Sequence, residues 1–151
     1  MQQESGITAV AHVIQLSVAP VFLLSGIGAM LAVMTNRLGR VIDRARLLEG
    51  GLPSASSEDL KHLHGELSTL SRRAKMINNA ITLCTATALL VCAVIAVLFL
   101  GTFAHFDASV PVSLLFITAM LAFFTGLVWF LREIFLATAS LRIGPHDSPH
   151  R

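Results

Sequence analysis

Residues 25–48 read SGIGAMLAVMTNRLGRVIDRARLL, and this stretch decides the fold. Its first half is small and apolar, as in a membrane-spanning helix, and its second half, from Asn36 on, is basic and amphipathic. Between the halves there is no proline, and Gly39 alone is a weak helix breaker. The stretch therefore predicts one helix that leaves the bilayer and continues into the cytoplasm.

Three apolar segments lack Lys, Arg, Asp and Glu and are long enough to cross a bilayer, and we place the spans at about 9–35, 76–100 and 110–131. The composition agrees, because 54% of the residues are hydrophobic and 13% are charged, against about 45–50% and about 25% in soluble domains. The sequence thus predicts an all-α integral membrane protein. We expect one membrane domain over residues 1–143 and a disordered tail over 144–151.

The positive charges set the expected orientation. Eight of the 11 Lys and Arg residues lie in the connector 36–75, and the other three follow the third span. The N-terminal segment and the loop 101–111 contain none. Because cytoplasmic loops are enriched in Lys and Arg, we expect the N-terminus outside and the C-terminus in the cytoplasm.

The connector itself is predicted to fold as an antiparallel helical hairpin. Two heptad-like apolar seams carry this prediction. The first consists of Met34, Leu38, Val41, Ala45 and Leu48, and the second of Leu60, Leu63, Leu67, Leu70, Ala74 and Ile77. Two glycines and Pro53 should end the first helix, with a loop of about eight residues and Ser56 or Ser57 capping the second. The apolar stretch after Arg132 is expected to continue as a helix over 134–143.

Small and polar residues in the first span have two interpretations. These residues are Ser17, Pro20, Ser25, Gly28 and Thr35. Ordinary close packing between helices explains them in the first interpretation, since small residues let helix backbones approach. In the second, they line a pore or form a hinge.

Residues typical of catalysis are missing from the sequence. The spans contain His12 but no acidic or strongly basic side chain, and no HExxH, GxSxG or phosphate-binding loop occurs. His62 and His64 are two residues apart on a predicted helix and do not face each other. We therefore expect no enzyme activity, no cofactor, no metal site and no nucleic-acid partner.

A cluster of cations marks the inner boundary of the first two helices. We call it the basic collar, and it consists of Arg37, Arg40, Arg44, Arg72, Arg73 and Lys75. Anchoring on anionic lipid headgroups is one interpretation of the basic collar, and an electrostatic funnel for anions or an acidic partner is the other. Asp43 either holds the arginines in an ion-pair network or is solvated.

The run NRLGRVIDRAR over residues 36–46, the helical return to Arg72 and Arg73, and the two further spans resemble the bacterial DUF2721 family of small membrane proteins. The similarity extends over about residues 8–140. It implies a three-span protein of the bacterial inner membrane, but no activity or substrate. It also suggests that Asn36, Gly39 and Asp43 form a structural motif.

Two functions follow from these expectations. In the first, the chain is a homo-oligomeric interaction or scaffold module whose hairpin contacts headgroups or a protein partner that the sequence does not identify. In the second, it is an oligomeric ion channel, with anions as candidate ions, lined by the first span. Three spans alone form too thin a bundle to enclose a pathway, so both functions require several subunits.

Overall fold

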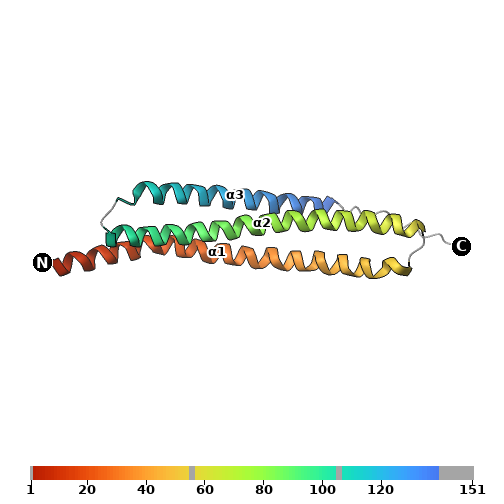
Figure 1. Ribbon diagram of the computed structural model, residues 1–151, viewed down its shortest axis with the longest axis horizontal. Coiled ribbons are helices and arrows are strands. Elements are labelled where there is room, and N and C mark those ends of the chain that lie inside the picture. Colours follow the sequence, from red (N-terminus) through yellow and green to blue (C-terminus); the bar gives the residue numbers. More distant parts are fainter. Residues whose placement is uncertain (1, 55–56, 105–106, 140–151) are drawn as a thin grey trace.

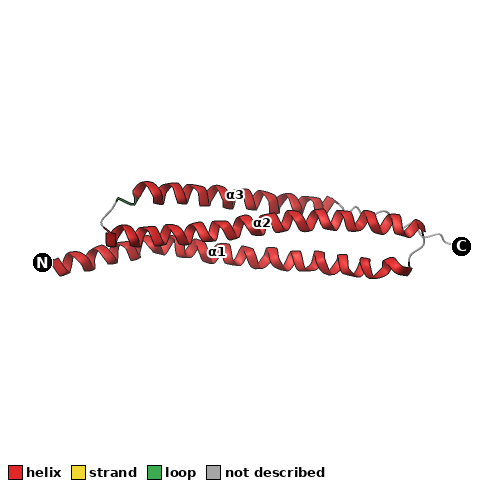
Figure 2. Ribbon diagram, viewed as in Figure 1, coloured by secondary structure: helices red, strands yellow, loops and turns green. Residues whose placement is uncertain are grey.

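The computed structural model describes residues 2–54, 57–104 and 107–139, and the side chains within 10–53, 59–104 and 107–137. Its helices are α1 (Gln2–Gly51), the short 3-10 turn η1 (Leu52–Ser54), α2 (Ser57–Ala104) and α3 (Ser109–Ala139). The described residues form no strand, so the fold is all-α as predicted (Figure 2). The central helix α2 packs antiparallel against both α1 and α3 (Figure 1).

Helix α1 is continuous through the change from apolar to basic sequence. Its 50 residues correspond to about 75 Å at 1.5 Å per residue, and Pro20 lies inside it. Five buried residues recur in α1 at intervals of seven: Val13, Pro20, Ile27, Met34 and Val41. One heptad line thus faces the neighbouring helix along both halves of α1, which confirms the prediction of a single unbroken helix.

Helix α2 supplies the matching surface. Ile77, Cys84 and Val91, again seven residues apart, are fully buried, and the Cys84 sulfur lies 4.0 Å from that of Met34. All residues of both predicted seams are buried or half-buried. Met34 and Val41 of the first seam and Ile77 of the second belong to one buried cluster, so α1 and α2 share a core along these positions.

Helix α3 packs on the other side of α2 through small residues. Ala119 is fully buried, and a Cβ added at Gly126 would lie 3.2 Å from the Cβ of Leu83 and 3.3 Å from the sulfur of Cys84. The hydroxyl of Thr87 donates to the carbonyl of Leu83 at 2.9 Å and lies 3.4 Å from that of Ala119. Small side chains thus bring the backbones of α2 and α3 close together.

All three helices are long and apolar enough to cross a membrane, over Val10–Gly51, Asp59–Ala104 and Ser109–Ala137. The second and third predicted spans lie within these segments, and the first begins one residue before its segment. Large apolar side chains such as Phe22, Phe103 and Phe124 are at least two-thirds exposed on the outside of the bundle. Burial in lipid accounts for such an exterior, so the fold indicates a membrane protein.

The connection between α1 and α2 is shorter than predicted. Helix α1 continues through Gly50 and Gly51, and η1 follows at once. The physical reason is Pro53, which disfavours the helical conformation of the residue before it and so ends α1 ahead of Leu52. Helix α3 continues past Arg132 to Ala139. Ser56, residues 140–143 and the tail 144–151 lie outside the described residues.

Candidate functional site

A buried carboxylate joins all three helices. Glu133 of α3 is fully buried and lies between Arg37 of α1 and Arg73 of α2. The Nε and Nη2 atoms of Arg73 donate to Oε1 of Glu133 at 3.2 and 3.0 Å. Nη2 of Arg37 lies 3.0 Å from Oε2. We call these three residues the arginine–glutamate clamp.

The two halves of the clamp differ in geometry. Arg73 makes two directed hydrogen bonds to one oxygen, whereas Oε2 accepts no aligned hydrogen bond from Arg37 or any other described residue. Arg37 is therefore held by charge, and its guanidinium also lies over the ring of Phe130, 5.7 Å from the centroid. A cation over an aromatic ring is attracted by the ring's negative face.

The clamp compensates the cost of burying a carboxylate. An isolated buried charge is strongly unfavourable, but two cations and the hydrogen bonds of Arg73 oppose that cost. The arginine side chains remain 26% and 22% exposed. The arrangement fixes the end of α3 on the α1–α2 hairpin.

The structure divides the basic collar into two sets. Arg37 and Arg73 belong to the clamp, while four members are exposed: Arg40, Arg44, Arg72 and Lys75. Of the motif residues, Gly39 is half-buried, and Asn36 and Asp43 are exposed. Asp43 makes no ion pair with any residue that the structure describes, so it is not the carboxylate that holds the arginines.

From the sequence alone, Glu133 was placed just after the third predicted span and was assigned no role. A signal was present, because Ala119, Gly126 and Glu133 are seven residues apart and occupy one heptad line of α3. Small residues at the first two positions mark the face that packs on α2. A carboxylate at the third position is therefore directed into the bundle, toward the arginines of the other helices.

The small and polar residues of the first span do not form one exposed face. Ser17 and Pro20 are buried, whereas Ser25, Gly28 and Thr35 are exposed. The three hydroxyls are satisfied within α1, since each donates to the carbonyl four residues earlier, at 2.8, 3.3 and 2.8 Å. Of these residues, only Ser25, Gly28 and Thr35 are therefore available to contact lipid or another subunit.

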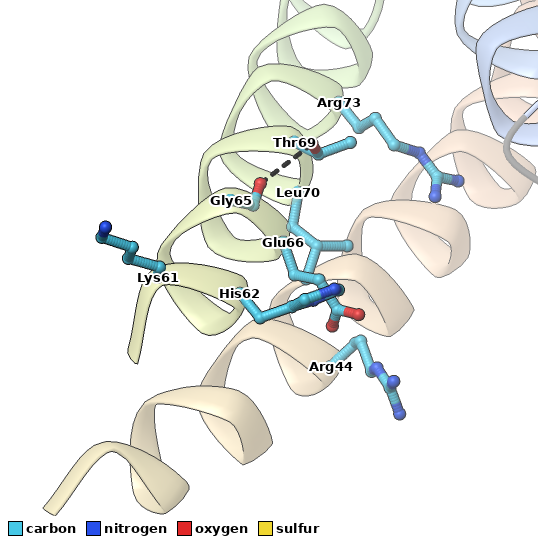
Figure 3. Close-up of a pocket in the computed structure, with 8 residues that line it drawn as sticks. All are labelled: Arg44, Lys61, His62, Gly65, Glu66, Thr69, Leu70 and Arg73. Atoms are coloured by element: carbon cyan, nitrogen blue, oxygen red, sulfur yellow. Dashed lines mark hydrogen bonds between the residues drawn. The ribbon is translucent and has the colours of Figure 1, made fainter. Parts of the chain in front are cut away.

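Two grooves flank the hairpin. The first has a volume of about 600 Å³, and its lining includes Arg44, His62, Glu66, Thr69 and Arg73. Figure 3 shows His62 and Glu66 on α2 and Arg44 on α1, with the guanidinium of Arg44 directed away from the carboxylate of Glu66. The second groove, of about 530 Å³, is lined in part by Arg46 and His64. Among the described residues no three His, Cys, Asp or Glu side chains cluster as metal ligands.

Comparison with known proteins assigns the family. Curated proteins gave no match to the chain, and solved structures gave none either. One family model, described as a protein of unknown function (DUF2721), matches residues 17–143, which is most of the chain. The match includes α1 from Ser17 onward, all of α2 and α3, and each member of the clamp. The chain therefore belongs to the DUF2721 family.

Proposed function

We propose that the protein is a non-catalytic, homo-oligomeric interaction or scaffold module of the bacterial inner membrane, with its α1–α2 hairpin in the cytoplasm. One observation carries this proposal. Arg40, Arg72 and Lys75 are exposed at the inner end of the apolar segments, whereas the clamp neutralises part of the charge of Arg37 and Arg73. The exposed set is thus free for anionic headgroups or an acidic protein surface.

The distribution of charge supports the orientation. The 11 Lys and Arg residues lie only in the connector and after the third span, and cytoplasmic segments carry this excess. The N-terminus would then be outside and the C-terminus inside. Labelling with a membrane-impermeant thiol reagent tests this, using one cysteine at Lys61 or at Asp107 in a background without Cys84 and Cys92. Only the cysteine at position 107 should react from the outside of intact cells.

Headgroup contact is tested with two matched double variants in nanodiscs that contain neutral and anionic lipids. Arg72→Gln with Lys75→Gln removes two cations at the proposed interface. The control, Arg46→Gln with Lys61→Gln, removes the same two residue types nearer the hairpin turn. Each cation near the surface contributes about 1 kcal/mol, so the first double variant should lose about 2 kcal/mol of preference for anionic lipid. Equal losses of preference for anionic lipid in the two double variants would refute headgroup contact by Arg72 and Lys75.

An ion channel is the second candidate, because Ser25, Gly28 and Thr35 present a small, partly polar face of α1 that α2 leaves exposed. The mass of the particle in nanodiscs separates the candidates. A ring of four or more subunits that conducts ions, with selectivity altered by Arg40→Glu, would favour the channel. A dimer would favour the scaffold, since six helices enclose little space.

A further inference from the structure

The first groove extends along the hairpin from the level of the clamp, and no described residue of α3 lines it. Arg73 lines the groove and also binds Glu133 of α3. Arg44, another lining residue, follows Arg37 by seven positions, or about 10 Å along α1. The described part of α3 ends six residues after Glu133, about 9 Å further on, and the hairpin extends beyond it (Figure 1).

The charges in the groove are not matched to one another. Arg44 and Glu66 are both exposed, and neither makes an ion pair with any described residue. Of the nitrogens of Arg73, Nε and Nη2 bind Glu133, which leaves Nη1 as a donor. His62 and the hydroxyl of Thr69 add further polar atoms. In the clamp, α3 supplies an anion between arginines of α1 and α2, but at the level of Arg44 it supplies none.

From this juxtaposition we propose that the groove binds the phosphate group of a small, soluble phosphate ester. Guanidinium groups recognise phosphate through charge-assisted hydrogen bonds, and Arg44 and Arg73 reach the groove from different helices. A volume of about 600 Å³ accommodates a phosphate with a small organic group, within the range of ligand pockets. The site includes Arg44 and Arg73 of the basic collar but not Arg40, Arg72 or Lys75, which carry the proposed function, so the two proposals can be tested separately.

The position of the groove favours a soluble ligand over a lipid headgroup. Its lining extends along α2 from Arg73 to Lys61, a distance of about 18 Å over twelve residues. Arg73 is at the level of the clamp, where α3 ends its apolar segment. A headgroup phosphate at the bilayer surface would meet only this end of the groove, whereas Arg44, Lys61 and His62 line the part nearer the hairpin turn.

The test is the binding of inorganic phosphate to the full-length protein in nanodiscs of zwitterionic lipid, followed by ³¹P NMR. Arg44→Gln with His62→Gln removes two donors from the groove. Arg46→Gln with His64→Gln is the matched control, because these residues line the opposite groove. We expect the Kd of the first double variant to rise about tenfold or more and that of the control to change less than about twofold. Glu66→Gln should lower the Kd, since it removes a negative charge from the site.

Three outcomes would overturn the assignment. Equal weakening in both double variants would show general attraction to a basic hairpin. Absence of saturable phosphate binding to the unmodified protein would exclude the soluble ligand. The protein is then placed in nanodiscs that contain phosphatidic acid. If enrichment of this lipid around the protein requires Arg44 and His62, the groove binds a lipid headgroup instead of a soluble phosphate ester. Unchanged circular dichroism and particle mass verify that each variant is folded.

Discussion

Replacement of Glu133 by glutamine should weaken the attachment of α3 to the other helices. The substitution keeps the size of the side chain but removes the charge between Arg37 and Arg73. Both arginines then lose their counter-ion at a position where Glu133 itself is fully buried. The perturbation therefore acts on charge and hydrogen bonding while packing is conserved.

The magnitude follows from the geometry of the clamp. Removing one partner of a fully buried ion pair costs about 3–5 kcal/mol. Here the arginine side chains are 26% and 22% exposed, so water or headgroups can solvate them in part. An amide oxygen at position 133 can still accept a hydrogen bond from Arg73. We therefore expect a loss of about 2 kcal/mol for glutamine and about 3 kcal/mol for alanine.

The single tryptophan of the chain provides a fluorescent probe of the attachment of α3. Trp129 lies on α3, one turn before Glu133, and packs against the hydrophobic core. Its fluorescence during a titration with sodium dodecyl sulfate in mixed micelles should report the separation of α3. Circular dichroism in the same titration measures the loss of helix. The glutamine variant should separate at a lower denaturant fraction, and Glu66→Gln, an exposed control, should behave like the unmodified protein.

Double-mutant cycles sharpen this prediction. Arg73 makes two directed hydrogen bonds to Glu133, whereas Arg37 makes only an ion contact. The coupling free energy between Glu133 and Arg73 should therefore exceed that between Glu133 and Arg37. A loss below about 0.5 kcal/mol for Glu133→Gln, or a reversed order of the couplings, would refute the view that the clamp holds α3.

Three further predictions concern the packing and the loop between α2 and α3. Gly126→Leu should destabilise the protein by about 1–3 kcal/mol in the same titration, because even a Cβ at this position meets α2 atoms at 3.2–3.4 Å. Thr87→Val should cost less than about 1 kcal/mol, because its hydroxyl bonds within its own helix at 2.9 Å and interhelical bonds in membranes are weak. Hydrogen bonds from Ser109 lower the pKa of Asp107. The stabilisation of the folded protein by these hydrogen bonds is therefore present above the ordinary carboxyl pKa, and it is lost as the pH falls through the lowered pKa. A ¹³C NMR titration of the Asp107 carboxyl group measures that pKa.

Periodicity explains how much of the fold could be predicted from the sequence. Met34 and Val41 on α1 and Ile77 on α2 were placed on facing seams by their spacing alone, and all three are buried. The continuity of α1 followed from the absence of proline between residues 25 and 48. The turn was predicted less well, because a loop of about eight residues was expected, whereas α1 continues through both glycines and η1 follows at once.

The candidate site was less accessible to sequence reasoning. The arginines of the clamp were recognised as cations near the inner boundary, but their partner is 96 residues from Arg37 and 60 from Arg73 along the chain. Periodicity assigns a face to each helix but does not establish which level of α3 meets which level of α1. Asp43 was closer in sequence and appeared the simpler partner, but it faces solvent. The groove could not be predicted either, because its position depends on where α3 ends along the hairpin.

The long sequence separation within the clamp has a consequence for biogenesis. Extensive contacts join α1 to α2 and α2 to α3, so each of these pairings forms between neighbours in the chain as the helices are inserted one after another. The link from α1 to Glu133 can form only after the third helix is synthesised and docked. Until then, Arg37 and Arg73 lack their carboxylate, so an incompletely assembled chain differs from the assembled one by unneutralised positive charge.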